Sequence, residues 1–270
     1  MSGGRKNYFE AGGEGYARFR PRYPEALIRL LASIAPCRSL ALDIGCGSGQ
    51  LTIALAEYFD EVIGVDPSDA QLSNAPQHAR VSYRRAGAEA LGEFDRPACL
   101  ITAAQAAHWF ELPLFYEEVR RVAAKKAYLA LITYGLPELD DARLNARFRR
   151  FNDEALSRHW PPERGLVDSK YAGLYFPFEE QEAPALTMEH RWTLNEFSGY
   201  LSTWSAFRRA RQKAHEKNEP PQKERDERGE RDDAQALFWS LELILREAWG
   251  GPERRRLIRW PLTLRLGLID

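Results

Sequence analysis

The stretch "ALDIGCGSGQL", residues 41–51, decides the fold. An apolar run carries Asp43 near its end, and glycines then stand at alternate positions, Gly45, Gly47 and Gly49. Glycine is used where the backbone must adopt a positive φ or approach a ligand closely. Because such a turn joins a strand to the following helix, we expect it at the carboxyl edge of a parallel sheet, where α/β proteins bind ligands.

The rest of the first half repeats the alternation of strand and helix. Short apolar runs predict strands, and segments with apolar residues at helical spacing predict the helices between them. Strands alternating with helices of this length are typical of a parallel sheet with right-handed crossovers. The predicted strands lie within residues 39–45, 61–68, 81–91, 98–110 and 126–135, and the predicted helices within residues 22–36, 48–59, 69–79 and 112–124.

The second half contains a different kind of sequence. Residues 136–183 combine helical patterns with a segment rich in proline and aromatic residues, which predicts a cap inserted before a sixth strand at residues 185–194. Residues 215–234 are almost wholly polar, which indicates a solvated loop. Further helices are predicted within residues 194–214 and 235–249, and a closing strand within residues 256–269.

The expected fold follows from these segments. The closing strand is predicted to be antiparallel, because no crossover helix stands directly before it. We therefore expect a single catalytic domain over residues 1–270, of the Rossmann-like α/β class. Its sheet should be mostly parallel and seven-stranded with an antiparallel last strand, and the helical and aromatic cap should lie between strands five and six.

Composition argues against several classes of protein. With 38 basic and 39 acidic residues the net charge is -1, so no overall positive field favours nucleic-acid binding. No apolar run is long enough to span a membrane, and the N-terminus lacks the apolar segment of a secretory signal. Cys37, Cys46 and Cys99 have no CxxC spacing and the histidines no HExxH spacing. We therefore expect a reducing, cytoplasmic setting with neither a disulfide framework nor a bound metal.

The glycine turn narrows the choice of ligand. Gln50 stands where the dinucleotide fingerprint GxGxxG has its third glycine, and the chain has no GxxxxGK[ST] loop for a nucleoside triphosphate. Asp43 would repel a pyrophosphate but attract an ammonium or a sulfonium. Asp66 ends the second predicted strand, where an acid can accept both hydroxyls of a ribose or, alternatively, cap a helix. S-adenosylmethionine (SAM) has the ammonium, the sulfonium and the ribose, and it has no phosphate.

Several segments resemble class I SAM-dependent methyltransferases. "LDIGCGSG" resembles the first motif of that family, "GVDPS" the second, and "AGAEAL" the loop that holds adenine. Four further segments are similar to its trans-aconitate methyltransferase-like branch, which acts on small molecules: "YARFRPRYP" (16–24), "AAQAAHWF" (103–110), "YLSTWSAFRRA" (200–210) and "RWPLTLRLG" (259–267). The resemblance implies a SAM cofactor, a small-molecule acceptor and neither a nucleic-acid nor a membrane partner.

The resemblance also assigns residues to the cofactor. The glycine turn and Asp43 would hold the methionine end, Asp66 the ribose and Glu89 the adenine amino group, with Ser68 near the adenine edge. The N-terminal residues 1–36 resemble a lid. The expected cofactor-binding set is Tyr16, Arg20, Asp43, Gly45, Cys46, Gly47, Gly49, Asp66, Pro67, Ser68, Ala88, Glu89 and Gln105.

Methyl transfer requires alignment of the acceptor with the methyl carbon more than it requires a catalytic group. A general base is needed only where the acceptor must lose a proton, and His108, with an ordinary pKa, is the candidate. The alternative is a histidine that only bonds backbone or packs against Trp109. The aromatic cap and the helix after it supply candidate acceptor contacts, or else a hydrophobic core. The expected acceptor-binding set is Trp109, Tyr171, Trp204 and Arg208.

Tyr175 departs from the family's pattern, in which proline is common at that place. A phenol pointing at the cofactor could orient the cofactor's own amine for attack on its γ-carbon. That reaction would give azetidine-2-carboxylic acid and methylthioadenosine, so a catalytic Tyr175 would indicate a SAM cyclase. A SAM-binding sensor without catalysis is a further alternative. The sequence does not fix the acceptor atom or the oligomeric state.

Overall fold

The computed structural model describes residues 19–207, 209 and 234–270. Tyr16, Arg208, the first half of the expected lid and nearly all of the polar stretch 215–234 lie outside the described residues. The described chain forms two compact units. The first falls within Met1–Pro137, Glu163–Glu189 and Arg259–Asp270, and the second within Glu138–Pro162 and His190–Ile258. The expected cap, residues 136–183, is therefore divided between the two units.

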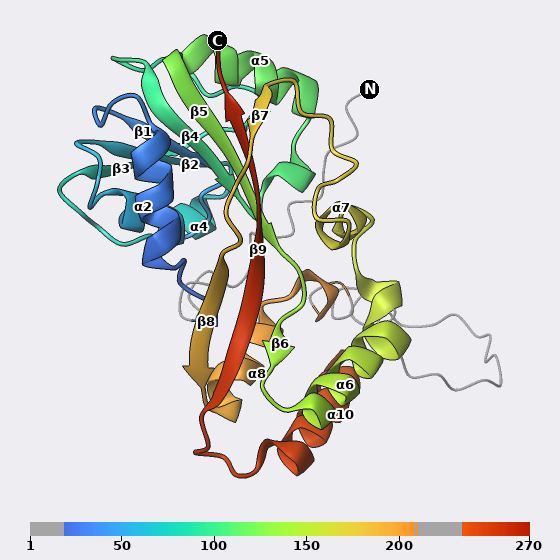
Figure 1. The fold of residues 1–270 in the computed structure, drawn as a ribbon. Helices are drawn as coiled ribbons and strands as arrows, with labels where there is room; N and C mark the ends of the chain where they lie inside the picture. The colour runs from blue at the N-terminus through green and yellow to red at the C-terminus, as the bar shows by residue number, and fades with distance from the viewer. Residues whose placement is uncertain (1–18, 208, 210–233) are drawn as a thin grey trace, which may run out of the picture. The chain divides into compact units, whose positions relative to one another are not determined.

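The first unit contains the predicted parallel sheet. Its five parallel strands have the order β3-β2-β1-β4-β5, and β9 is antiparallel to β5 as expected. Figure 1 shows β5 and β9 side by side. The strand order reverses at β1, because β2 and β3 lie on one side of it and β4 and β5 on the other. Such a topological switch point is where α/β sheets bind ligands. The strands are β1 (Ala41–Ile44), β2 (Val62–Asp66), β3 (Val81–Arg85), β4 (Ala98–Ala104), β5 (Ala123–Tyr134) and β9 (Arg256–Leu268).

Helices connect the strands of the first unit where the sequence predicts them. Most are shorter than the predicted segments, and α4 is a single turn because Pro76 follows it closely. The helices are α2 (Glu25–Ile34), α3 (Gln50–Leu55), α4 (Asp69–Leu72), the 3₁₀ turn η1 (Ala107–Trp109), α5 (Leu112–Val122) and α7 (Arg164–Asp168).

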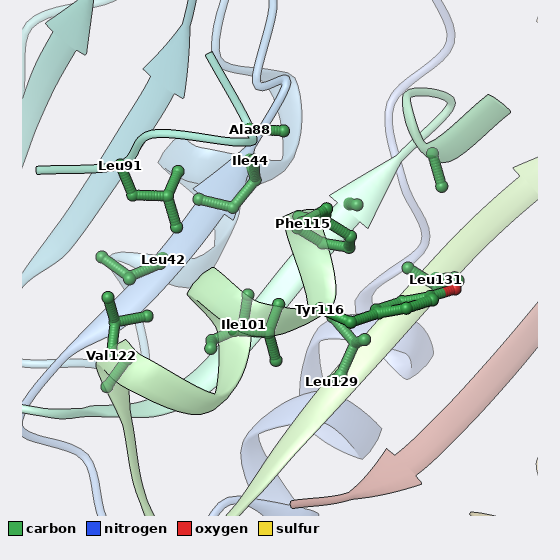
Figure 2. Close-up of a cluster of buried hydrophobic side chains, with 14 of the residues drawn as sticks. Leu42, Ile44, Ala88, Leu91, Ile101, Phe115, Tyr116, Val122, Leu129 and Leu131 are labelled. Carbon is green, nitrogen blue, oxygen red and sulfur yellow. The ribbon is translucent and has the colours of Figure 1, made fainter. Parts of the chain in front are cut away.

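The core of the first unit forms between α5 and one face of the sheet. Phe115 and Tyr116 of α5 lie over Ile101 of β4 and Leu129 and Leu131 of β5, as Figure 2 shows, and all five are buried. Apolar residues of α5 recur at helical spacing, so its other face carries charged residues. This packing fixes the segment between β4 and α5, which contains His108 and Trp109.

The second unit is largely helical. It contains β6 (Glu138–Leu139), α6 (Ala142–Phe151), a π turn η2 (Asn152–Leu156), a 3₁₀ turn η3 (Ser157–His159), α8 (Leu194–Ser202) and α10 (Ala234–Trp249). Trp204 is buried there, with its ring 5.1 Å from that of Trp160 and 5.9 Å from that of Phe148. The structure therefore places Trp204 in an aromatic core.

The sheet has more strands than the predicted seven. Two short strands, β6 and β7 (Glu179–Gln181), pair with β9 in addition to β8 (Thr187–Trp192), which gives nine strands in the described part of the chain. With two and three residues, β6 and β7 are too short to give an alternating pattern, which is why the sequence does not reveal them.

Cys37 and Cys99 form a disulfide, with Cα atoms 5.5 Å apart. The expectation that the chain has no disulfide is therefore wrong. The two cysteines are 62 residues apart, and only the packing of β4 beside β1 brings them together, so their spacing gave no signal. Cysteine usage consequently no longer argues for a reducing compartment. Among the helices that the structure describes, none combines the length and apolar character needed to cross a bilayer.

Arg265 of β9 holds the turn that follows α7. Its guanidinium donates to the backbone carbonyls of Tyr171 and Leu174 and forms a two-point ion pair with Glu180 of β7 at 2.7 Å. Tyr171 has a φ of +60°, a conformation that disfavours a bulky side chain. Arg265 therefore contributes stabilising contacts to a turn whose backbone conformation is unfavourable for tyrosine.

Replacing Arg265 with Met should destabilise the protein, because two carbonyls and a carboxylate lose their donor. We expect a loss of about 2 kcal/mol in the free energy of unfolding, measured by urea denaturation. The matched control is Arg259→Met on the same strand, whose ion pair with Glu189 is solvent-exposed. That change should cost under about 1 kcal/mol. Equal losses for the two variants would contradict the role given to Arg265.

Candidate active site

An open cavity lies at the carboxyl ends of the parallel strands in the first unit. Its empty volume is about 860 Å³, part of it open to solvent, which suits a small-molecule ligand. The cavity combines the glycine turn, both predicted acids and several aromatic rings. Its wall is formed by Arg20, Pro21, Tyr23, Asp43, Gly45, Cys46, Gly47, Gln50, Leu51, Asp66, Pro67, Gln71, Ala104, Gln105, Ala106, Trp109, Phe110 and Tyr134.

The glycine turn is fastened to the end of β2. The backbone N–H groups of Gly45 and Cys46 donate to the Val65 carbonyl at 2.7 and 3.0 Å. Gly45 has a φ of +69°, and a Cβ added there would lie 2.5 Å from the Cβ of Ala106. A side chain at this position would therefore clash with the segment after β4, so glycine is required by both conformation and space.

Asp43 presents a buried carboxylate at the end of β1. It is 1% exposed, and its two oxygens accept hydrogen bonds from Thr52 of α3 at 2.7 Å and Thr102 of β4 at 2.8 Å. Burial raises the pKa of Asp43 to about 6, although the two hydroxyl donors act against that shift. A cation that entered the cavity beside Asp43 would favour the charged carboxylate.

Asp66 organises the loops at the end of β2. Its carboxylate accepts from the backbone N–H groups of Gly47 and Ser68, each at 2.9 Å. Burial raises the pKa of Asp66, while these two backbone donors act to lower it. Ser68, which we expected near adenine, caps α4 by accepting from the backbone N–H of Gln71. Asp66 therefore lines the cavity while also holding the glycine turn.

Gln105 follows β4 in the left-handed conformation, with a φ of +54°. Three hydrogen bonds fix it to β5. Its backbone N–H donates to Ile132, its side-chain amide donates to the Tyr134 carbonyl, and its side-chain oxygen accepts from Thr133. The carboxamide of Gln105 is thus engaged with the protein, and the residue acts as a rigid part of the cavity wall.

His108 does not line the cavity. Its Nδ1 lies 2.8 Å from the hydroxyl of Tyr171, and its ring packs 5.0 Å from that of Trp109. Burial, with a smaller effect from the Arg164 guanidinium, lowers the pKa of His108 to about 3. The expectation of an ordinary histidine pKa is therefore wrong, and the imidazole is neutral at pH 7. The contact with Trp109 matches the alternative interpretation of this residue.

Other predicted residues also lie away from the cavity wall. Tyr175 is 71% exposed and its backbone carbonyl accepts from Tyr116, so its phenol does not point at the cavity. Tyr171 is fully buried beside His108. Ala88 lies in the core of the first unit (Figure 2), and Glu89 accepts from the backbone N–H of Glu111. Gly49 is the N-cap residue of α3 and is not among the residues that line the cavity.

Comparisons with known proteins identify the family. A family model described as a methyltransferase domain matches residues 41–126. A Dictyostelium discoideum protein described as a methyltransferase is 36% identical over 72% of this chain and 75% of its own length. The chain belongs to the methyltransferase family. A solved type II methyltransferase, by its description, from Anaeromyxobacter dehalogenans is 43% identical, with a TM-score of 0.78 over 93% of this chain and 98% of its own.

A third relative is more distant. A Saccharomyces cerevisiae protein described as an S-adenosylmethionine-dependent methyltransferase, CRG1, is 27% identical over 71% of this chain and 78% of its own length. The matched region of the family model begins at β1 and therefore includes the glycine turn, Asp43 and Asp66. Together the comparisons confirm the Rossmann-like methyltransferase fold that the sequence predicts.

The cavity of this methyltransferase contains residues that the sequence analysis missed. Tyr134 could have been found from its place at the end of β5, because the carboxyl ends of parallel strands share one edge. Gln71 lies on the short helix α4, which follows β2 and Asp66 directly, and this position is a comparable signal. The missed residues are Pro21, Tyr23, Gln50, Leu51, Gln71, Ala104, Ala106, Phe110 and Tyr134.

The raised pKa of Asp43 predicts a stability change in the methyltransferase without ligand. The folded-state pKa of about 6 exceeds the ordinary value of 3.8, so folding favours the protonated acid and this stability is lost as the pH rises through 6. Asp43→Asn should therefore raise the free energy of unfolding at pH 7.5 by roughly 1–3 kcal/mol.

Urea denaturation at two pH values checks this expectation. The gain from Asp43→Asn should shrink as the pH falls below 6 and disappear below about pH 3, where the wild-type side chain is protonated in both the folded and the unfolded state. The exposed Asp60→Asn is the matched control and should change stability by less than about 0.5 kcal/mol at either pH. A loss of stability in Asp43→Asn at pH 7.5 would show that the ionised form is favoured by folding.

Proposed function

We propose that this SAM-dependent methyltransferase transfers the methyl group to a small-molecule acceptor that enters the same cavity. The observation that carries the proposal is the pair of buried carboxylates, Asp43 and Asp66, on either side of the glycine turn. A trans-aconitate methyltransferase-like acceptor stays a prediction based on the resemblance of four segments. The cavity, about 860 Å³ including its open mouth, has the size that is usual for small-molecule sites.

The chemistry of the cavity wall fits SAM. Burial raises the pKa values of both acids, so each carboxylate gains when a cation or a hydrogen-bond donor reaches it. Asp43 would face the charged methionine end, and the remaining lone pairs of Asp66 would accept ribose hydroxyls. Arg20, also in the wall, suits the carboxylate of the ligand.

SAM, when bound, supplies a methyl group on a positively charged sulfur that leaves as a neutral thioether. The role of the protein is to orient SAM and the acceptor and to keep water away from the reacting atoms. Asp43, oriented by Thr52, would hold the charged end of SAM, and the rigid Gln105 fixes the wall where β4 ends. Trp109, Phe110 and Tyr134 give an apolar surface that excludes water on the β4–β5 side. Alignment of an acceptor there supplies most of the rate enhancement.

The role of His108 in this proposal is limited. A neutral imidazole whose pKa is about 3 is a weak base, and its Nδ1 is already beside the Tyr171 hydroxyl. We propose that His108 and Tyr171 position Trp109 in the wall rather than take a proton from the acceptor. An acceptor that is already anionic, such as a carboxylate, needs no base at this site.

The alternatives have lost their specific support. SAM cyclisation depended on a Tyr175 phenol near the cofactor, and that ring is largely exposed. A sensor without catalysis has no observation of its own in its favour. Methyl transfer by alignment therefore remains the proposed reaction, and it is tested by its products.

Incubation with SAM should distinguish the three candidate functions: methyl transfer, SAM cyclisation and SAM sensing without catalysis. We expect S-adenosylhomocysteine to form only when an acceptor is added, measured by mass spectrometry with a panel of small carboxylates, amines and phenols. Methylthioadenosine formed from SAM alone at enzymatic rates, above a heat-inactivated control, would instead support the cyclase. Tight SAM binding with neither product across the panel would support the sensor.

The affinity for SAM should depend on pH through Asp43. In the free protein its pKa is about 6, so below that pH a cationic ligand must displace a proton. The Kd should therefore rise by up to about tenfold per pH unit below pH 6 and level off above pH 7. Calorimetry with SAM measures this, and methylthioadenosine, which lacks both charges, is the matched control. An equal pH dependence for the two ligands would argue against contact between Asp43 and the cation.

A further inference from the structure

Gln71 is a buried polar side chain in the cavity wall that no part of the mechanism uses. It lies on α4, directly after β2, and is 2% exposed. Neither its side-chain oxygen nor its side-chain nitrogen has a hydrogen-bond partner among the residues that the structure describes. Buried amides are almost always hydrogen-bonded, because burying one without a partner is unfavourable. An amide in this state at a cavity wall points to a ligand that completes its hydrogen bonds.

The other two glutamines of the wall differ from Gln71. Gln105 uses both ends of its carboxamide on β5, and Gln50 donates to the Ser48 hydroxyl at 2.8 Å. Helix α4 does not need the Gln71 side chain either. Its first turn is capped by Ser68, which accepts from the Gln71 backbone. The Gln71 carboxamide therefore contributes no hydrogen bond to the fold described here.

We propose that Gln71 hydrogen-bonds the nucleoside half of SAM and helps to select it. This inference rests on the proposed use of SAM. The charged end of the ligand belongs beside Asp43 on β1, and the acceptor belongs on the β4–β5 side with Gln105 and Trp109. In the order β3-β2-β1-β4-β5, this leaves the β2 end, with Asp66 and Gln71, for the uncharged polar half.

The carboxamide has the chemistry that this half requires. It presents one acceptor and two donors in a plane. An adenine edge offers a neighbouring donor and acceptor, the pair that glutamine binds at two points, and a ribose hydroxyl can both donate and accept. An apolar side chain at position 71 would provide surface contact with the nucleoside but would not distinguish its polar groups.

Gln71→Met tests the inference because it should weaken SAM binding without lowering the stability of the protein. The change removes an unpartnered amide at nearly constant volume. The melting temperature of the ligand-free protein should therefore stay the same or rise. In calorimetry the Kd values for SAM and for methylthioadenosine should both rise about tenfold, because the two ligands share the nucleoside. The matched control is Asn74→Ala, an amide on the same segment that donates to the Ala70 carbonyl and does not line the cavity. It should leave both Kd values unchanged.

Two altered ligands separate base from sugar. Methylthioinosine lacks the 6-amino group, and 2′-deoxymethylthioadenosine lacks one hydroxyl. The ligand against which wild type discriminates more strongly than Gln71→Met identifies the group that Gln71 contacts. Unchanged affinity of Gln71→Met for SAM and methylthioadenosine would overturn the inference, as would a lower melting temperature together with weaker binding, which indicates a structural role. Failure of the wild-type protein to bind SAM would instead overturn the proposed function.

Discussion

The site depends on one buried carboxylate, that of Asp43. Its burial raises its pKa to about 6, so ionising this carboxylate is less favourable in the folded protein than in the unfolded chain. Thr52 and Thr102 orient both oxygens from elements on either side of β1. The free energy that folding loses by burying this group becomes available when a cation enters the cavity. If Asp43 binds the cationic end of SAM, as we propose, selection of that ligand and the stability penalty in its absence have the same physical cause.

A few hydrogen bonds to backbone N–H groups fix the loops around that acid. Asp66 connects the glycine turn to the start of α4, and Val65 accepts from two N–H groups of the turn. These contacts, all made between groups of the protein itself, join the ends of β1 and β2. A turn that the protein holds in this way does not have to be ordered by the ligand, so less binding free energy is lost to conformational entropy.

The sequence predicts the parts of the structure that depend on local pattern. The glycine spacing, the two acids and the alternation of strand and helix predict the sheet and one edge of the cavity. Features set by distant packing are not predictable in this way. The disulfide joins residues 62 positions apart, the pKa of His108 depends on burial under residues from other elements, and Trp204 belongs to an aromatic core. Tyr175 illustrates the remaining difficulty, because nothing local to residues 171–178 indicates that its ring lies outside.

The left-handed Gln105 has a consequence for how the enzyme could change its acceptor. Three hydrogen bonds to β5 join the loop after β4 to the neighbouring strand, so this side of the cavity is a stiff surface rather than a movable flap. A new acceptor preference would then arise most readily by substitution of aromatic residues on that surface, such as Trp109 and Tyr134, with side chains of a different size. Lengthening the loop itself would break the hydrogen bonds that hold an unfavourable backbone conformation in place.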